Sequence, residues 1–267
     1  MGPFVRDHQI PVYFALAFAS SWTMVALIPV SFAFALLALF GPALSAISVT
    51  AMTEGGQGLA CLFRRITIWR AGVLWYALAV GVPLLVAVVA QVAHALVVAG
   101  PIGMSVSTPL PLMLILALLV IGEEIGWRGF ALPHLQDRYG GLTASLILGS
   151  AWACWHLANA TIPGLEAYWS SFPAFLLFVL GQTIFMTWLW NRAGASLLLM
   201  WISHAMINTS VSLFFVGDQT QEWWFAGGAL AAVAIVVLMV DGPELAGRAS
   251  RNPVPISSLI GPSVGAH

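Results

Sequence analysis

The segment Ile121 to Gly129 carries the side chains best suited to chemistry, the adjacent carboxylates Glu123 and Glu124 followed by Arg128. They stand at the end of an apolar run that begins at Leu110. On a helix that advances about 100° per residue, Glu124 and Arg128 share one face and can form an ion pair. Glu123 points about 100° away from Glu124. The spacing therefore predicts one carboxylate held by the arginine and one available for acid or base chemistry.

Two later apolar segments also carry polar side chains at helical spacing. Trp152 and His156 lie four residues apart in one, and His204 and Asn208 lie four apart in the other, so each pair shares a helix face. A single buried histidine commonly has only a packing role, and an isolated charge pair at an interface only a snorkelling one. Three such segments are harder to explain in that way, because desolvated polar groups need partners. We therefore expect their side chains to converge in one pocket.

The composition indicates a membrane setting for these residues. Of the 267 residues, 60% are hydrophobic and 7% are charged, and the mean hydropathy is +0.95, whereas soluble domains contain roughly 25% charged residues. The predicted fold class is all-α, a polytopic membrane protein in contact with the lipid bilayer. A net charge of −1 without a basic block gives no basis for a nucleic-acid partner.

Apolar runs of about 20 residues predict about eight transmembrane helices. The run from Ile10 to Met52 is long enough for two of them. The others are expected at 73–98, 110–133, 142–161, 172–190, 195–215 and 223–240. We predict one transmembrane domain over residues 1–241 and a disordered cytosolic tail over 242–267, which is rich in Pro, Ser and Gly.

The arginines predict the orientation of these helices. With eight spans and a cytosolic N-terminus, all arginines outside the spans fall on the cytosolic side, and the opposite loops after spans three, five and seven carry only acidic charges. The positive-inside rule then predicts a multi-pass protein with both termini in the cytosol. The Ala-, Gly- and Arg-rich composition favours a bacterial plasma membrane. The buried polar site is expected toward the cytosolic side. Helix counting places Glu123 and His204 roughly 12–14 Å deep but His156 roughly 22 Å deep, so these depths disagree.

The three motifs, in this order, resemble the CAAX protease and bacteriocin-processing family of intramembrane endopeptidases, which includes type II CAAX prenyl endopeptidases and lysostaphin-resistance-like proteins. The resemblance covers about residues 41–215. One departure is Trp152, where the family usually has Phe four residues before the first histidine; it preserves an aromatic wall. The resemblance implies hydrolysis of a peptide bond within the membrane. The implied partner is a peptide or protein substrate, and this class includes membrane-associated and lipidated substrates. The resemblance does not define the oligomeric state.

The resemblance and the chemistry of the side chains together predict catalytic roles. Glu123 is expected to act as the general base on water, with His156 helping to hold the water and transfer its proton. His204 and Asn208 are expected to donate hydrogen bonds to the oxyanion of the tetrahedral intermediate.

Three further residues are expected to bind substrate or orient the site. Glu124 paired with Arg128 would orient the motif or bind a substrate carboxylate, which the fork of a guanidinium matches. Trp152 would form the aromatic wall.

The sequence leaves open whether a metal takes part. No cofactor is the preferred interpretation, because the chain lacks a His-Glu-x-x-His helix. Zinc is the alternative, with Glu123, His156 and His204 as its three ligands.

Two other classes of function use similar residues. A proton-coupled transporter also places Glu and His inside the membrane, although its halves usually repeat and no repeat is visible here. A catalytically silent membrane accessory or chaperone protein could retain the same side chains.

Overall fold

The computed structural model describes residues 2–99, 102–104, 108–162, 167–216 and 219–245. Within this part of the chain every regular element is helical, and no strand is present. The helices are α1 (Gly2–Asp7), α2 (Gln9–Ala26), α3 (Ala33–Ala38), α4 (Gly41–Thr53), α5 (Gly55–Arg64), η1 (Arg65–Thr67), α6 (Val73–Val98), α7 (Leu110–Leu119), α8 (Ile121–Gly126), η2 (Trp127–Ala131), α9 (Leu132–Tyr139), α10 (Gly141–Trp155), η3 (His156–Thr161), α11 (Ala167–Ser170), α12 (Phe172–Arg192), α13 (Leu197–Phe214) and α14 (Gln219–Asp241).

Six helical segments are long and apolar enough to cross a membrane. They are Gln9–Ala26, Val73–Val98, Leu110–Tyr139, Phe172–Arg192, Leu197–Phe214 and Thr220–Asp241. The predicted all-α, polytopic fold is therefore confirmed. Two further predicted spans correspond to the shorter helices α4, with 13 residues, and α10, with 15 residues. The number eight stays a prediction.

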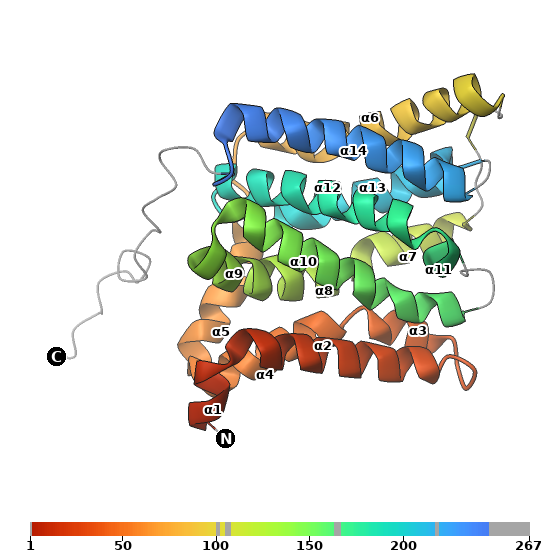
Figure 1. Cartoon of the computed structure of the whole chain (residues 1–267). Helices are drawn as coiled ribbons and strands as arrows, with labels where there is room; N and C mark the ends of the chain where they lie inside the picture. The colour runs from red at the N-terminus through yellow and green to blue at the C-terminus, as the bar shows by residue number, and fades with distance from the viewer. Residues whose placement is uncertain (1, 100–101, 105–107, 163–166, 217–218, 246–267) are drawn as a thin grey trace.

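The longer helices run side by side along a common axis (Figure 1). At one end lie α1, α5 and α9, and at the other lie α3 and α11. We call the first the arginine end, because exposed arginines lie on or beside its elements. They are Arg6, Arg64, Arg70, Arg138 and Arg192. We call the second the α3–α11 end. The clustering agrees with the pattern from which the cytosolic side was predicted.

The residues just after α14 pack back onto the arginine end. The Leu142 amide donates to the Pro243 carbonyl at 2.8 Å, and the Asn191 side chain donates to the Leu245 carbonyl at 3.0 Å. The Leu245 side chain is fully buried. The remainder of the predicted tail, residues 246–267, lies outside the described residues.

Two glycines bring α8 against the start of α4. Gly122 and Gly126 are four residues apart and share a face of α8. A Cβ atom built on Gly126 would lie 2.4 to 2.6 Å from Pro42, its backbone included, and one on Gly122 would lie 2.8 Å from the Phe40 ring. Small residues at this spacing allow helices in membranes to approach closely. The glycines thus fix the position of the helix that carries both glutamates.

Replacement of Gly126 by alanine should destabilise the protein by about 1–3 kcal/mol or more, because the new methyl group overlaps rigid backbone. The measurement is the free energy of unfolding in detergent. Gly81→Ala is the matched control, since Gly81 is a helical glycine with open space around its Cβ position. Equal stability of the two variants would contradict close packing of α8 on α4.

Candidate functional site

The helix that carries the glutamates contains a wider turn directly after them. The Leu132 amide donates to the Trp127 carbonyl, five residues back, which defines a π-helical turn over Trp127–Ala131. Pro133 follows, and proline has no amide hydrogen to donate to the Gly129 carbonyl. Arg65 supplies that hydrogen bond from Nη1 at 2.6 Å. Burial lowers the pKa of the Arg65 guanidinium from its ordinary value.

These contacts explain why one predicted boundary was wrong. The sequence predicted that this span ends near Pro133, whereas the helical segment continues to Tyr139. The π turn and the Arg65 hydrogen bond accommodate the proline inside the helix. The longer segment brings the estimated depth of Glu123 into agreement with that of His156, because Glu123 and His156 lie 16 residues before Tyr139 and 15 residues after Gly141. These separations are about 24 Å and 22 Å.

Glu124 is the centre of a buried charged cluster. Its Oε1 accepts hydrogen bonds from Arg128 Nη1 at 2.8 Å and from His204 Nδ1 at 2.7 Å. The side chains of Glu124 and Arg128 are fully buried. The predicted ion pair between them is therefore present, and His204 joins it from another helix. The hydrogen bond between His204 and Glu124 fixes α8 relative to α13.

Glu123 points to a different partner, as the helical geometry predicted. Its Oε2 accepts a hydrogen bond from Trp152 Nε1 at 2.9 Å. The Trp152 ring also lies under the Arg128 guanidinium, 4.3 Å from the ring centroid, and edge-on to the His204 ring at 5.0 Å. Trp152 therefore connects the three helices of the site, in addition to forming the aromatic wall that the sequence predicted.

The hydrogen bonds of the two histidines assign their protons. His156 Nδ1 lies 2.8 Å from the Trp152 carbonyl, which can only accept. His204 Nδ1 lies beside the Glu124 carboxylate, which also accepts. Both Nδ1 atoms must therefore carry hydrogen, and in a neutral ring Nε2 is then the atom with the lone pair.

A single cavity of about 430 Å³ brings most of these residues together. Of the predicted site residues, five line it: Glu123, Trp152, His156, His204 and Asn208. Asn208 is exposed, whereas Glu123 and His204 are buried. Glu124 and Arg128 are not among its lining residues, so their position favours orientation of the site over contact with substrate. Glu123 lies near the middle of its 30-residue segment rather than close to the arginine end.

The alternative zinc site was tested on the same geometry. Among the residues that the structure describes, no three His, Cys, Asp or Glu side chains are grouped as metal ligands. These side chains therefore do not form a three-ligand zinc site.

Sequence reasoning gave no role to Tyr13, which belongs to α2. Its ring is fully buried and packs against Trp127 and Phe130, with centroid separations of 5.7 and 5.0 Å. It also lies within electrostatic range of Arg128 and Glu124. Tyr13 stands alone in an apolar segment, and no spacing links it to the motifs. Its contacts follow only from the fold.

The fold and the site together define a class of protein, a multi-pass helical membrane protein with a buried glutamate and two histidines around one cavity. The family described as "Type II CAAX prenyl endopeptidase Rce1-like" matches residues 105–210, which include all of the predicted site residues. The predicted resemblance to the CAAX protease and bacteriocin-processing family is confirmed by this match and by a curated relative.

That relative is "CAAX prenyl protease 2" of Methanococcus maripaludis, which is 31% identical to this chain over 147 residues. The match spans 52% of this chain and 53% of the relative. The chain therefore spans about half the length of the curated relative that it matches.

Replacement of Arg128 by methionine should lower the free energy of unfolding by about 3–5 kcal/mol, because the Glu124 carboxylate would lose its buried counter-charge. The double variant Glu124→Gln with Arg128→Met should recover much of this loss, since no unpaired charge remains. Denaturant unfolding in detergent measures both.

The control is Arg138→Met. Arg138 is exposed at the arginine end, and its loss should change stability by no more than about 0.5 kcal/mol. An Arg128→Met protein as stable as this control would show that the buried pair does not hold α8 in place.

Proposed function

We propose that this protein is an intramembrane endopeptidase that hydrolyses a peptide bond with water activated by Glu123. The observation that carries the proposal is the common cavity that holds the Glu123 carboxylate, both histidines and Asn208. The match to CAAX prenyl endopeptidases over the same residues supports it.

Glu123 is the general base in this mechanism. Trp152 Nε1 holds one carboxylate oxygen, which fixes the direction of the other toward the cavity. Glu123 takes a proton from water while the water oxygen attacks the peptide carbonyl carbon. His156 contacts the same cavity and has its Nδ1 hydrogen committed to the Trp152 carbonyl, so its Nε2 can accept a hydrogen bond from the water.

The tetrahedral intermediate then needs hydrogen-bond donors for its oxyanion. Asn208 can donate from its side-chain amide. His204 can donate from Nε2 when its ring is doubly protonated, with the Nδ1 hydrogen held on Glu124. The reaction ends when the C–N bond breaks and the proton held by Glu123 passes to the amine that leaves.

The substrate is a peptide or protein segment that enters the bilayer. The curated relative is named for prenylated CAAX substrates, and we extend that class to this chain as the first to be tested. The cavity suits an apolar group beside the scissile bond, because most of its described lining is aromatic or aliphatic.

Replacement of Glu123 by glutamine should reduce peptide cleavage by about 10²–10⁴-fold, because glutamine cannot accept the proton. The assay uses purified protein in detergent and an internally quenched peptide that ends in a farnesylated CAAX sequence. Glu54→Gln serves as the control, since Glu54 lies outside the cavity. Full activity of Glu123→Gln would refute the proposed base.

We also propose that the reaction is metal-free. Treatment with a zinc chelator such as 1,10-phenanthroline should leave the rate of peptide cleavage unchanged, because no three His, Cys, Asp or Glu side chains among the described residues are grouped as metal ligands. A loss of activity that added zinc restores would contradict this, and would favour the alternative set of Glu123, His156 and His204.

A further inference from the structure

The π turn after the two glutamates receives a hydrogen bond from a segment that is remote in the sequence. Arg65 lies in η1, and its Nη1 donates to the Gly129 carbonyl at 2.6 Å. Pro133 leaves this carbonyl without its usual amide partner. The Arg65 guanidinium also lies over the Trp190 ring of α12, 5.5 Å from the ring centroid. Arg65 therefore connects the π turn to the rest of the arginine end.

The backbone of both glutamates is bonded directly to this turn. The Trp127 amide, at the start of the turn, donates to the Glu123 and Glu124 carbonyls. Arg128 follows in the same turn and carries the guanidinium that pairs with the Glu124 carboxylate. Gly129 is the next residue. A shift of the Gly129 carbonyl therefore moves the backbone that sets the directions of both carboxylates.

The segment that contains Arg65 also holds the start of α13. The carbonyl of Ile68, three residues after Arg65, accepts a hydrogen bond from Ser196 Oγ at 2.5 Å. Ser196 is the N-cap of α13, and it is fully buried. This short segment therefore contacts both of the helices that meet through Glu124 and His204.

Apolar packing joins the same elements. A Cβ atom built on Gly129 would lie 2.9 Å from the Leu62 side chain of α5 and 3.3 Å from the Leu197 side chain of α13. Leu62 and Leu197 are both buried. Glycine at this position lets α5 and α13 approach the π turn closely. The hydrogen bonds of Arg65 and Ile68 therefore belong to one packed junction.

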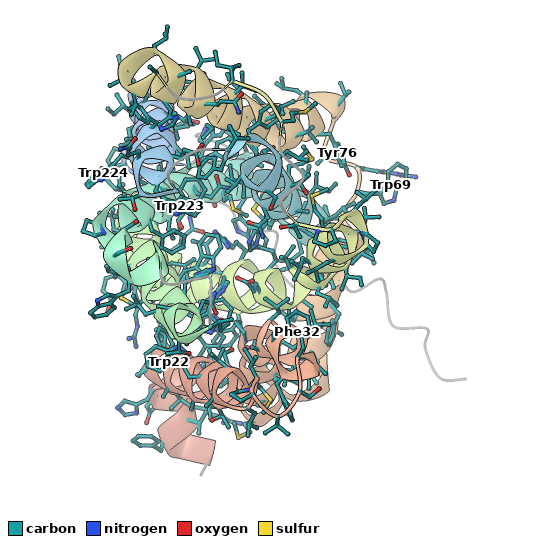
Figure 2. All side chains as sticks on the ribbon, turned by 90° about the vertical axis from the view of Figure 1, so that its right-hand side faces the viewer. Trp22, Phe32, Trp69, Tyr76, Trp223 and Trp224 are labelled. Atoms are coloured by element: carbon teal, nitrogen blue, oxygen red, sulfur yellow. The ribbon has the colours of Figure 1, made fainter. Side chains whose placement is uncertain are left out.

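The chain is also held directly after this junction. Tyr76 Oη, on α6, donates to the Trp69 carbonyl at 2.7 Å, and the Arg70 guanidinium lies 4.9 Å from the centroid of the Trp69 ring. Figure 2 shows Trp69 projecting from the edge of the molecule beside Tyr76. Tryptophan and arginine are typical of the membrane interface. The segment is thus fixed to α6 independently of its contacts with the site helices.

We propose that Arg65 is a positioning residue for the site, and that residues 65–68 form a clamp that sets α8 and η2 relative to α13. Arg65 does not line the large cavity, so it acts through the Gly129 carbonyl rather than on substrate. The clamp adds a second connection to the hydrogen bond between Glu124 and His204. The effect of Arg65 on catalysis rests on the proposed function, whereas the clamp itself does not.

A donor supplied from within the helix tests the proposal. Arg65→Met removes the hydrogen bond to Gly129, and Pro133→Ala returns an amide hydrogen four residues after this carbonyl. The kcat and KM for the farnesylated peptide are measured for the unmodified protein, both single variants and the double variant. Arg138→Met is the control, because Arg138 is an exposed arginine at the same end of the bundle.

Arg65→Met should lower kcat about 10–100-fold with little change in KM, because the base moves relative to the reacting atoms while the cavity keeps its lining. The double variant should recover most of kcat, since it regains the donor without regaining the positive charge. Pro133→Ala alone and Arg138→Met should retain the kcat of the unmodified protein. An unchanged kcat in Arg65→Met, or an equal loss with and without Pro133→Ala, would overturn the proposal.

Melting temperatures of the same proteins in detergent provide a measurement that needs no turnover. Arg65→Met should lower the melting temperature by roughly 3–10 °C, and by clearly less when Pro133→Ala is present. A variant that folds only in combination with Pro133→Ala would support the clamp as well. Equal losses in both backgrounds would contradict it. The expected pattern in a protein that cleaves no peptide would leave the clamp standing and refute only the proteolytic function.

Discussion

The structure depends on the burial of charge on α8. Glu124 and Arg128 are fully buried, and an unpaired charge in such surroundings would be strongly destabilising. Arg128 supplies the counter-charge to Glu124 from the same helical segment, and His204 donates a second hydrogen bond to the Glu124 carboxylate from α13. The position of α13 is therefore tied to α8 by a charged hydrogen bond. The same contact engages Nδ1 of His204, whose ring also lines the cavity. The pairing of the buried charge therefore also positions a residue of the site.

Trp152 performs a related task for Glu123. Its indole hydrogen bonds to the carboxylate, its ring lies against Arg128, and its backbone carbonyl holds His156. A phenylalanine at this position would keep the ring but not the hydrogen bond to Glu123. The departure from the usual family residue therefore adds a polar contact to the site. In this chain the aromatic wall also orients the predicted base.

Much of the site was predictable because helical spacing fixes which side chains share a face. The Glu124–Arg128 ion pair and the divergence of Glu123 follow from the 100° advance per residue. Spacing cannot show which helix faces which, so the Glu124–His204 contact and the position of Tyr13 were not foreseen. The end of the fourth span was misplaced because proline usually ends a helix, whereas Arg65 donates a hydrogen bond to the Gly129 carbonyl, which Pro133 cannot do. The sequence around Pro133 does not indicate that Arg65 makes this hydrogen bond.

The central claim is that α8 and α13 meet through Glu124 and His204, and a double-mutant cycle tests it most directly. The free energy of unfolding in detergent is measured for Glu124→Ala, His204→Ala, the double variant and the unmodified protein. We predict a coupling energy of about 1.5–3 kcal/mol, the usual range for a hydrogen bond to a charged group. A coupling energy within about 0.5 kcal/mol of zero, as for independent positions, would contradict the account.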